Sequence, residues 1–181
     1  MPGRRPIVNM LHLLRHAKSS AKEDVEDHER PLSRRGHEAA RRVGRHLPAM
    51  AGTLDLVLCS SALRTRETLD LVLAEFSPRP RSVFEDELYL ASRERLMDRL
   101  RRIDEADVNI LLIGHNPGLH ELAVALAEKN SPNFRALACG KFPTAAYASF
   151  QIPERWSVLG YSRNELIDYV TPESLAGGRG R

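Results

Sequence analysis

The sequence predicts an α/β protein in which a mostly parallel central sheet is covered by helices on both faces. Three short apolar runs, at 10–14, 54–59 and 108–113, are bounded by turn-forming residues and have the length of buried strands. Stretches with helical spacing separate these runs along the chain. Such alternation implies crossover connections between parallel neighbours of one sheet.

Four stretches place apolar residues at the spacing of one helix face. They contain Ala39, Ala40, Val43 and Leu47; Leu69, Val72, Leu73 and Phe76; Leu96, Leu100 and Ile103; and Leu119, Leu122, Ala123 and Leu126. Ser33 and Ser92 are suited to cap two of these helices, and Asn116 with Pro117 is suited to begin the fourth. Later strands are expected at 144–152 and 156–161.

The chain of 181 residues has the size of one domain. No interior linker or repeat divides it, so we expect a single domain over 1–181. The segments at about 1–9 and 173–181 are expected to be flexible termini, since the chain ends on the sequence GGRGR.

Composition argues against several classes of function. The net charge of +3 is modest and the arginines are scattered, which does not favour nucleic-acid binding. No apolar run is long enough to cross a bilayer, and the start lacks the pattern of a secretory signal, so we expect a cytoplasmic protein that does not bind a membrane. Cys59 and Cys139 have neither metal-ligand nor disulfide spacing and are expected to be free thiols.

Basic side chains follow three of the predicted strands. Arg15 and His16 follow the first, Arg64 lies in the helix after the second, and His115 and Asn116 follow the third. Ligands of an open parallel sheet bind beyond the carboxyl ends of its strands, so these residues should meet at one edge. Arginine matches phosphate oxygens with a fixed fork of donors, and a helix beginning near Asn116 favours an anion. The pattern therefore predicts a phosphate site.

A histidine in such a site can attack phosphorus. Neighbouring cations lower the pKa of an imidazole and keep its lone pair available near neutral pH. Taken singly, each of His16, Arg64 and His115 is better explained as an ordinary loop or surface residue. Their repeated placement at one sheet edge favours a functional site.

The segments LHLLRHAKSS, RPLSRRG, SSALRTRETL and IGHNPGL resemble, in order, the motifs of the histidine phosphatase superfamily, which includes the phosphoglycerate mutases. The sequence is most similar to its short SixA-like branch of phosphohistidine phosphatases, over about 10–152. The resemblance implies a phosphoglycerate mutase-like fold, and it implies that His16 becomes phosphorylated. It further implies that Arg15, Arg64 and His115 bind the phosphate, with His115 also stabilising charge during transfer.

The resemblance also bears on Ala17 and Glu87. The usual motif has glycine after the Arg-His pair, whereas this chain has Ala17, as SixA-like sequences also do; Ala17 must then have an ordinary backbone conformation. Glu87 falls where many family members have an acid that protonates the leaving group, and Glu85 and Asp86 are adjacent alternatives.

Several further polar residues lie near the predicted site or elsewhere in the chain. Residues that could contact substrate are Lys18, Ser19 and Arg30, and Asn116 beside His115. His12 and His16 are too far apart on a strand to share a metal ion. The other four histidines, His28, His37, His46 and His120, are expected to be solvent-exposed without a role.

The leading hypothesis is thus a phosphatase, without metal or cofactor, that forms a phosphohistidine intermediate. Its expected partner is a phosphorylated protein, in particular one phosphorylated on histidine, because the loops around the site look short and its mouth open. A second hypothesis is a small-molecule phosphomonoesterase or mutase, whose substrate would be a small phosphoester. A third is a phosphoprotein-binding module without turnover, which the presence of both histidines disfavours.

Overall fold

The structure is a computed structural model that describes residues 8–21 and 24–177. Its six strands form one sheet. The strands are β1 (Asn9–Arg15), β2 (Leu56–Ser60), β3 (Arg81–Glu85), β4 (Asn109–Gly114), β5 (Tyr147–Ile152) and β6 (Glu165–Val170). The helices are α1 (Arg34–Ala51), α2 (Leu63–Leu73), α3 (Arg93–Arg101), α4 (Gly118–Leu126), α5 (Phe134–Cys139) and α6 (Pro172–Gly177), with short 3-10 turns η1 (Asp27–Glu29), η2 (Asp86–Leu88) and η3 (Trp156–Val158).

The strand order is β3-β2-β4-β1-β5-β6. The pairs β3–β2, β2–β4 and β4–β1 are parallel, whereas β1–β5 and β5–β6 are antiparallel. The predicted α/β class and the mostly parallel sheet are therefore confirmed, with an antiparallel extension along one side. Because β1, β4 and β2 are adjacent and parallel, their carboxyl ends meet at one edge.

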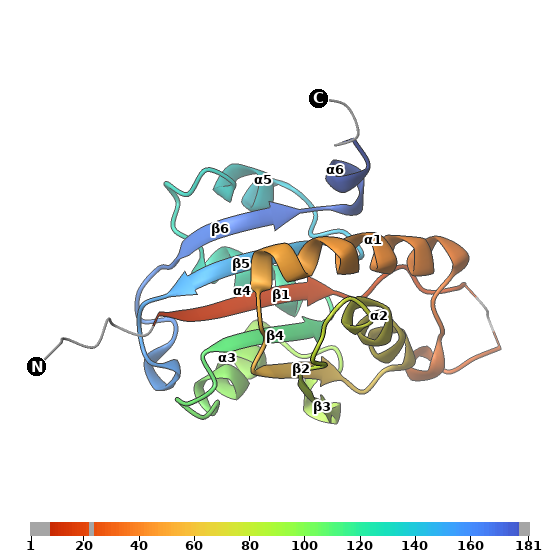
Figure 1. The fold of residues 1–181 in the computed structure, drawn as a ribbon, viewed down its shortest axis with the longest axis horizontal. Coiled ribbons are helices and arrows are strands. Elements are labelled where there is room, and N and C mark those ends of the chain that lie inside the picture. The colour runs from red at the N-terminus through yellow and green to blue at the C-terminus, as the bar shows by residue number, and fades with distance from the viewer. Residues whose placement is uncertain (1–7, 22–23, 178–181) are drawn as a thin grey trace, which may run out of the picture.

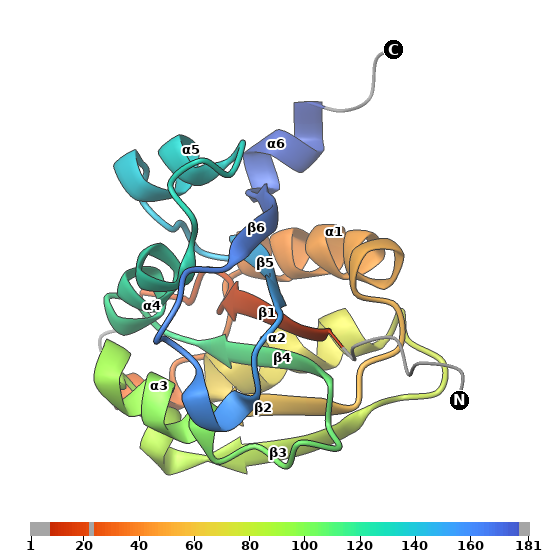
Figure 2. The same cartoon turned by 90° about the vertical axis from the view of Figure 1, so that its left-hand side faces the viewer.

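Two apolar layers cover the sheet. One layer packs α1 and α2 on one face through residues such as Val43, Leu47 and Leu69. The other packs α3, α4 and α5 on the opposite face through Leu100, Leu122 and Leu137. Figure 1 shows the first pair of helices in front of the sheet, and Figure 2 shows the helices on its two sides.

The central strands owe their formation to continuous burial. Every residue of β2 is buried, and β1 and β4 are buried at nearly every position. The predicted caps of two helices are also present, since the hydroxyls of Ser33 and Ser92 accept hydrogen bonds from the N–H groups of Gly36 and Arg95.

Two strands that the sequence analysis did not predict are the edges of the sheet. In β3 no residue is fully buried, and in β6 only Leu166 is. Edge strands have one free side and mixed polarity, so they lack the apolar run that reveals a central strand.

The strand expected at 156–161 is wrong. Trp156 and Leu159 are fully buried there, but they belong to the turn around η3. The indole N–H of Trp156 donates to the carbonyl of Asp107 at 2.7 Å, which fixes the turn against the loop before β4. The apolar residues are buried as their composition predicts, but they are buried in a turn and not in a strand.

The segments expected to be flexible termini, at about 1–9 and 173–181, lie only partly within the described residues. Asn9 begins β1 and is buried, and α6 covers Pro172–Gly177. The remaining terminal residues, 1–7 and 178–181, lie outside the described residues. No helix in the described part of the chain is both long and apolar enough to cross a membrane.

Candidate active site

The carboxyl ends of β1 and β4 bring two histidines together. His16 follows β1 and His115 follows β4, and the N–H of His16 donates to the carbonyl of Gly114 at 3.1 Å. The ring centroids of the two histidines are 5.1 Å apart. Arg64 reaches the same place from the first turn of α2, because β2 lies beside β4 in the sheet.

The ring of His16 has a defined tautomer. Its Nδ1 lies 2.8 Å from the carbonyl oxygen of Ala17, which can only accept, so Nδ1 carries the hydrogen and Nε2 holds the lone pair. His16 is 8% exposed. Burial first, and then the charges of Arg64 and Arg15, lower its pKa to about 4. The ring is therefore neutral near neutral pH and its Nε2 is available as a nucleophile.

The backbone after His16 is fixed to α2. The N–H of Ala17 donates to the hydroxyl of Thr68 at 3.0 Å, and this hydroxyl donates to the carbonyl of Arg64 at 2.7 Å. Outside glycine, the described residues with positive φ are Leu90 and Ala145, so Ala17 has the ordinary backbone conformation that its side chain requires.

His115 is held between a donor and an acceptor. Its Nε2 lies 2.7 Å from the hydroxyl of Ser60, and its Nδ1 lies 3.5 Å from Nη2 of Arg64. A guanidinium only donates, so Nδ1 keeps its lone pair and Nε2 donates to Ser60. Burial, followed by the neighbouring His16 and Arg64, lowers the pKa of His115 to about 3. Both histidines are thus neutral in the free protein.

Two arginines supply positive charge. Arg64 is 4% exposed, and its Nη1 and Nη2 donate to the backbone carbonyl and the carboxylate of Asp27 at 2.6 and 3.0 Å. Arg15 donates from Nη1 to the carbonyl of Phe142 at 2.9 Å, while its buried Nε has no acceptor among the described residues. A buried donor of this kind can take an oxygen of a bound anion.

Asn116 supports the site through its side chain. The helix expected to begin at Asn116 instead begins at Gly118, and Asn116 does not cap it; its Nδ2 donates to the carbonyl of Phe142 at 2.8 Å. The same carbonyl accepts from Arg15. The carbonyl of Phe142, in the loop before β5, therefore connects the end of β1 with the residues after β4. Asn116 has this role instead of the predicted helix cap.

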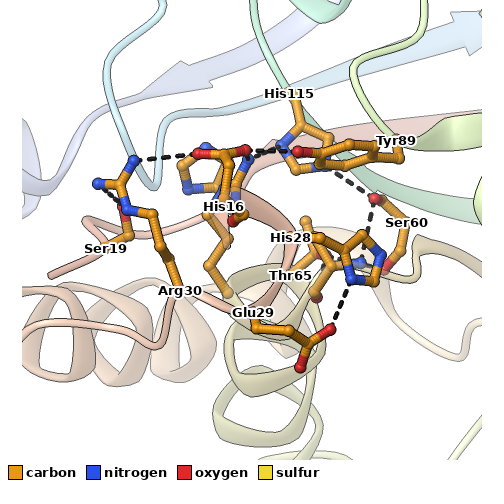
Figure 3. A network of polar contacts seen from close by, with 12 residues as sticks. His16, Ser19, His28, Glu29, Arg30, Ser60, Thr65, Tyr89 and His115 are labelled. Carbon is orange, nitrogen blue, oxygen red and sulfur yellow. Dashed lines mark hydrogen bonds and ion pairs between the residues drawn. The ribbon is translucent and has the colours of Figure 1, made fainter. Parts of the chain in front are cut away.

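Asp27 and Tyr89 belong to this cluster although the sequence analysis did not select them. The hydroxyl of Tyr89 donates to Asp27 Oδ2 at 2.5 Å, and its ring meets the ring of His115 edge-on with centroids 5.4 Å apart. Figure 3 shows Tyr89 beside His115, with Arg30 approaching from the opposite side. The sequence held one signal for each residue. Asp27 lies just before the RPLSRRG segment, and Tyr89 lies just after the acidic run at 85–87.

Glu87 does not contact the histidines or Arg64, as a proton donor for the leaving group would be expected to do. Its carboxylate pairs with Arg102 at 2.8 Å and with Arg99 at 3.6 Å. The alternative Glu85 is bound by Arg99 at 2.6 Å, and Asp86 is exposed. Among the contacts of the described residues, none joins these three carboxylates to His16, Arg64 or His115, whereas Asp27 contacts Arg64 directly.

Of the other residues expected to contact substrate, some are bound to protein groups and one is free to reach a substrate. Arg30 donates to the carbonyl of Ser20, the hydroxyl of Ser19 and the carboxylate of Asp27, so it organises the loop after His16. Lys18 is exposed and lines a surface cleft together with Arg35 and Thr144. Lys18 therefore remains accessible to a substrate, whereas Arg30 and Ser19 bind each other.

The four histidines expected to be exposed are in fact half-buried, each with a defined partner. His28 lies 2.9 Å from the hydroxyl of Ser61 and edge-on to Tyr89; His37, His46 and His120 contact the carbonyl of Ser33, the carboxylate of Asp168 and the carbonyl of Leu137. His12 is fully buried between Asn109 and Tyr147. Within residues 8–21 and 24–177, no group of three or more His, Cys, Asp or Glu side chains could hold a metal ion.

Comparison with known proteins places this chain in a family. A model of the histidine phosphatase superfamily (branch 1) matches residues 11–88, which include Arg15, His16 and Arg64. The chain belongs to the histidine phosphatase superfamily, in its SixA-like branch. An uncharacterized protein of Mycobacterium tuberculosis is 31% identical over 161 residues, covering 88% of this chain and 99% of that protein.

Two solved structures of histidine phosphatases are similar over most of their length. A candidate phosphohistidine phosphatase SixA from Nakamurella multipartitia has a TM-score of 0.80 and 26% identity, covering 91% of this chain and 96% of that one. A second, from Agrobacterium tumefaciens, has a TM-score of 0.77 and 27% identity, covering 91% and 98%. The fold is therefore that of the superfamily, phosphoglycerate mutase-like as predicted.

Proposed function

We propose that this histidine phosphatase hydrolyses phosphohistidine carried by a protein, through a phosphohistidine intermediate on its own His16. The observation that carries the proposal is the lone pair on Nε2 of His16. It is buried, unprotonated near neutral pH, and grouped with Arg15, Arg64 and His115. This combination supports nucleophilic attack on a bound phosphoryl group.

The roles follow from the contacts. Arg15 and Arg64 hold phosphoryl oxygens, with Arg15 Nε as an open donor, and His115 lies beside His16 where charge develops during transfer. Nε2 of His16 attacks phosphorus, the bond to the leaving group breaks, and its electron pair departs with that group. Water then attacks phospho-His16, the P–N bond breaks, and orthophosphate is released while a proton of the water passes to solvent.

The connections around the site support a protein substrate. Only Ser61 and Ala62 separate β2 from α2, and only residues 115–117 separate β4 from α4. The longer connection from β1 to α1, residues 16–33, brings Asp27 and Arg30 to the site. The side chain of Asp27 is 48% exposed, so this side of the site is open to solvent and can admit a side chain carried by another protein. The two similar structures named for SixA phosphohistidine phosphatases, each more than a quarter identical to this chain, support the same substrate class.

The proposed reaction needs no metal or cofactor, because the protein's own arginines and histidines supply the charge and the nucleophile.

We further propose that the protein works in the cytoplasm. Cys59 is buried and Cys139 is exposed, and both are free, which is typical of a reducing compartment.

The test compares substrates and a nucleophile variant. Wild type should hydrolyse a phosphohistidine peptide with a higher kcat/KM than a phosphotyrosine peptide or a sugar phosphate. His16→Ala should abolish turnover and labelling of the protein by radioactive phosphate, with its circular dichroism unchanged. His46→Ala, which removes a histidine bound to Asp168, is the matched control and should remain active.

Each alternative function has its own outcome. A preference for a sugar phosphate would identify a small-molecule phosphatase, and binding of phosphopeptides without release of phosphate would identify a binding module. Full turnover by folded His16→Ala would contradict the assignment of the nucleophile.

A further inference from the structure

The carboxylate of Asp27 is fixed at the phosphate-binding arginine. Its Oδ2 accepts from Arg64 at 3.0 Å and from Tyr89 at 2.5 Å, and its Oδ1 accepts from Arg30 at 3.1 Å. A carboxylate has about four lone-pair positions. Oδ1 accepts one of these bonds and can take another donor. The hydrogen bond from Tyr89, with the nearby arginines, lowers the pKa of Asp27 to about 2, so the group is charged near neutral pH.

The exposed fractions of the side chains show that Asp27 lies on the solvent side of the site. The side chain of Arg64 is 5% exposed and that of Asp27 is 48% exposed. His16 and His115 are as buried as Arg64. In-line attack from His16 puts the leaving group opposite the nucleophile, and a leaving group attached to another protein must lie toward solvent. The leaving group therefore departs on the side where Asp27 lies.

Aromatic rings stand beside this carboxylate. The ring of Tyr89 meets His115 on one side and His28 on the other, with centroids 5.4 and 5.0 Å apart. Both Tyr89 and His28 are half-buried. The solvent side of the site thus presents a fixed negative charge next to ring surfaces, which suits a flat, positively charged group.

The leaving group of phosphohistidine has this character, whereas that of a phosphomonoester does not. When the second nitrogen of a phosphohistidine ring is protonated, the ring is cationic; on cleavage of the P–N bond the electron pair stays on the ring nitrogen and a neutral imidazole departs. A phosphomonoester instead develops negative charge on its leaving oxygen, which a nearby carboxylate opposes.

We propose that Asp27 determines specificity by accepting a hydrogen bond from the second ring nitrogen of the phosphohistidine being cleaved. This inference rests on the proposed function. Asp27 favours the protonated, reactive form of that substrate and disfavours dianionic phosphomonoesters by like-charge repulsion. The residue thereby replaces the separate proton donor that an oxygen leaving group would require.

The experiment measures the ratio of two kcat/KM values, one for a phosphohistidine peptide and one for p-nitrophenyl phosphate. Asp27→Asn keeps the shape of the side chain and removes its charge. It should lower the first value and raise the second, so that the ratio falls roughly 10- to 100-fold, as expected for a hydrogen bond to a charged group. Asp27→Ser is a second replacement whose ratio should fall similarly.

Glu29→Gln is the matched control. The substitution removes one negative charge from the same turn, but Glu29 pairs with His28 and not with Arg64. Its ratio should stay within about twofold of wild type. An unchanged ratio in folded Asp27→Asn, including an equal loss on both substrates, would show that Asp27 only positions Arg64 and would overturn the inference. Wild type that hydrolyses p-nitrophenyl phosphate but not the peptide would overturn the proposed function itself.

Discussion

His16 and His115 lie side by side, with ring centroids 5.1 Å apart and ring planes inclined by 51°. Nδ1 of His16 donates to the carbonyl of Ala17, and Nε2 of His115 donates to the hydroxyl of Ser60. The nitrogen left with a lone pair is therefore Nε2 in His16 and Nδ1 in His115. Arg64 donates to Nδ1 of His115, whereas Nε2 of His16 has no hydrogen-bond partner among the described residues, so Nε2 of His16 is the ring nitrogen available to a phosphoryl group.

Ser60→Ala should impair the reaction without altering Arg15 and Arg64, the arginines that we propose bind phosphate. The hydroxyl of Ser60 is fully buried and is the acceptor for Nε2 of His115, so its removal leaves a buried donor unpaired at a cost of about 1–3 kcal/mol. We expect kcat/KM for p-nitrophenyl phosphate to fall roughly 10- to 100-fold. Ser61→Ala, one residue further and bound to His28, is the control. Equal activity of the two variants would exclude this role for Ser60.

Gly36→Ala should move the loop that carries His16. Gly36 lies in the first turn of α1, where a Cβ would stand 2.1 Å from the backbone oxygen of Lys18. That oxygen cannot rotate away, so either the helix or the loop must shift, at about 1–3 kcal/mol. Urea denaturation should show the loss of stability, and kcat should fall with it. At Gly177 a Cβ meets nothing within 4 Å, so Gly177→Ala should match wild type in both measurements.

The central part of the fold could be predicted from the sequence because burial and periodicity coincide there. The strands β1, β2 and β4 are nearly continuous apolar runs, and α1 places Val43 and Leu47 on one buried face. Where the two signals separate, prediction was incomplete or wrong. The edge strands β3 and β6 were missed because they are partly exposed, and residues 156–161 are apolar and buried without being a strand.

The site could be predicted as far as its residues follow strands. Arg15, His16, Arg64 and His115 lie at strand ends or in the following helix, and the structure brings them together. Asp27 comes from a turn between β1 and α1, and nothing in the spacing of a loop residue fixes where its carboxylate lies. Glu87 matched a family position, but its partners Arg99 in α3 and Arg102 just after α3 could not be inferred from the residues next to Glu87 in the sequence.

Glu87→Gln should therefore change catalysis little. The carboxylate pairs with Arg102 and Arg99 and is 40% exposed, so losing its charge is expected to cost at most about 1 kcal/mol of stability. We expect kcat/KM within about twofold of wild type for both an alkyl phosphate and a phosphohistidine peptide. A drop of tenfold or more confined to the alkyl phosphate would restore Glu87 as the proton donor.

The pH dependence should report the burial of His16. A histidine with an ordinary pKa of 6.5 would be mostly protonated at pH 5.5, but burial lowers the pKa of His16 to about 4, with smaller contributions from Arg64 and Arg15. The lone pair on Nε2 is thus retained as pH falls through 6.5 and lost only as it falls through about 4. NMR titration of the ring carbon signals, assigned by their absence in His16→Ala, measures this directly. Arg64→Met removes one cation but not the burial, so the pKa of His16 should rise and still remain below 6.5. Titration of wild-type His16 near 6.5 would show that its nucleophile is not protected from protonation in the way that the structure implies.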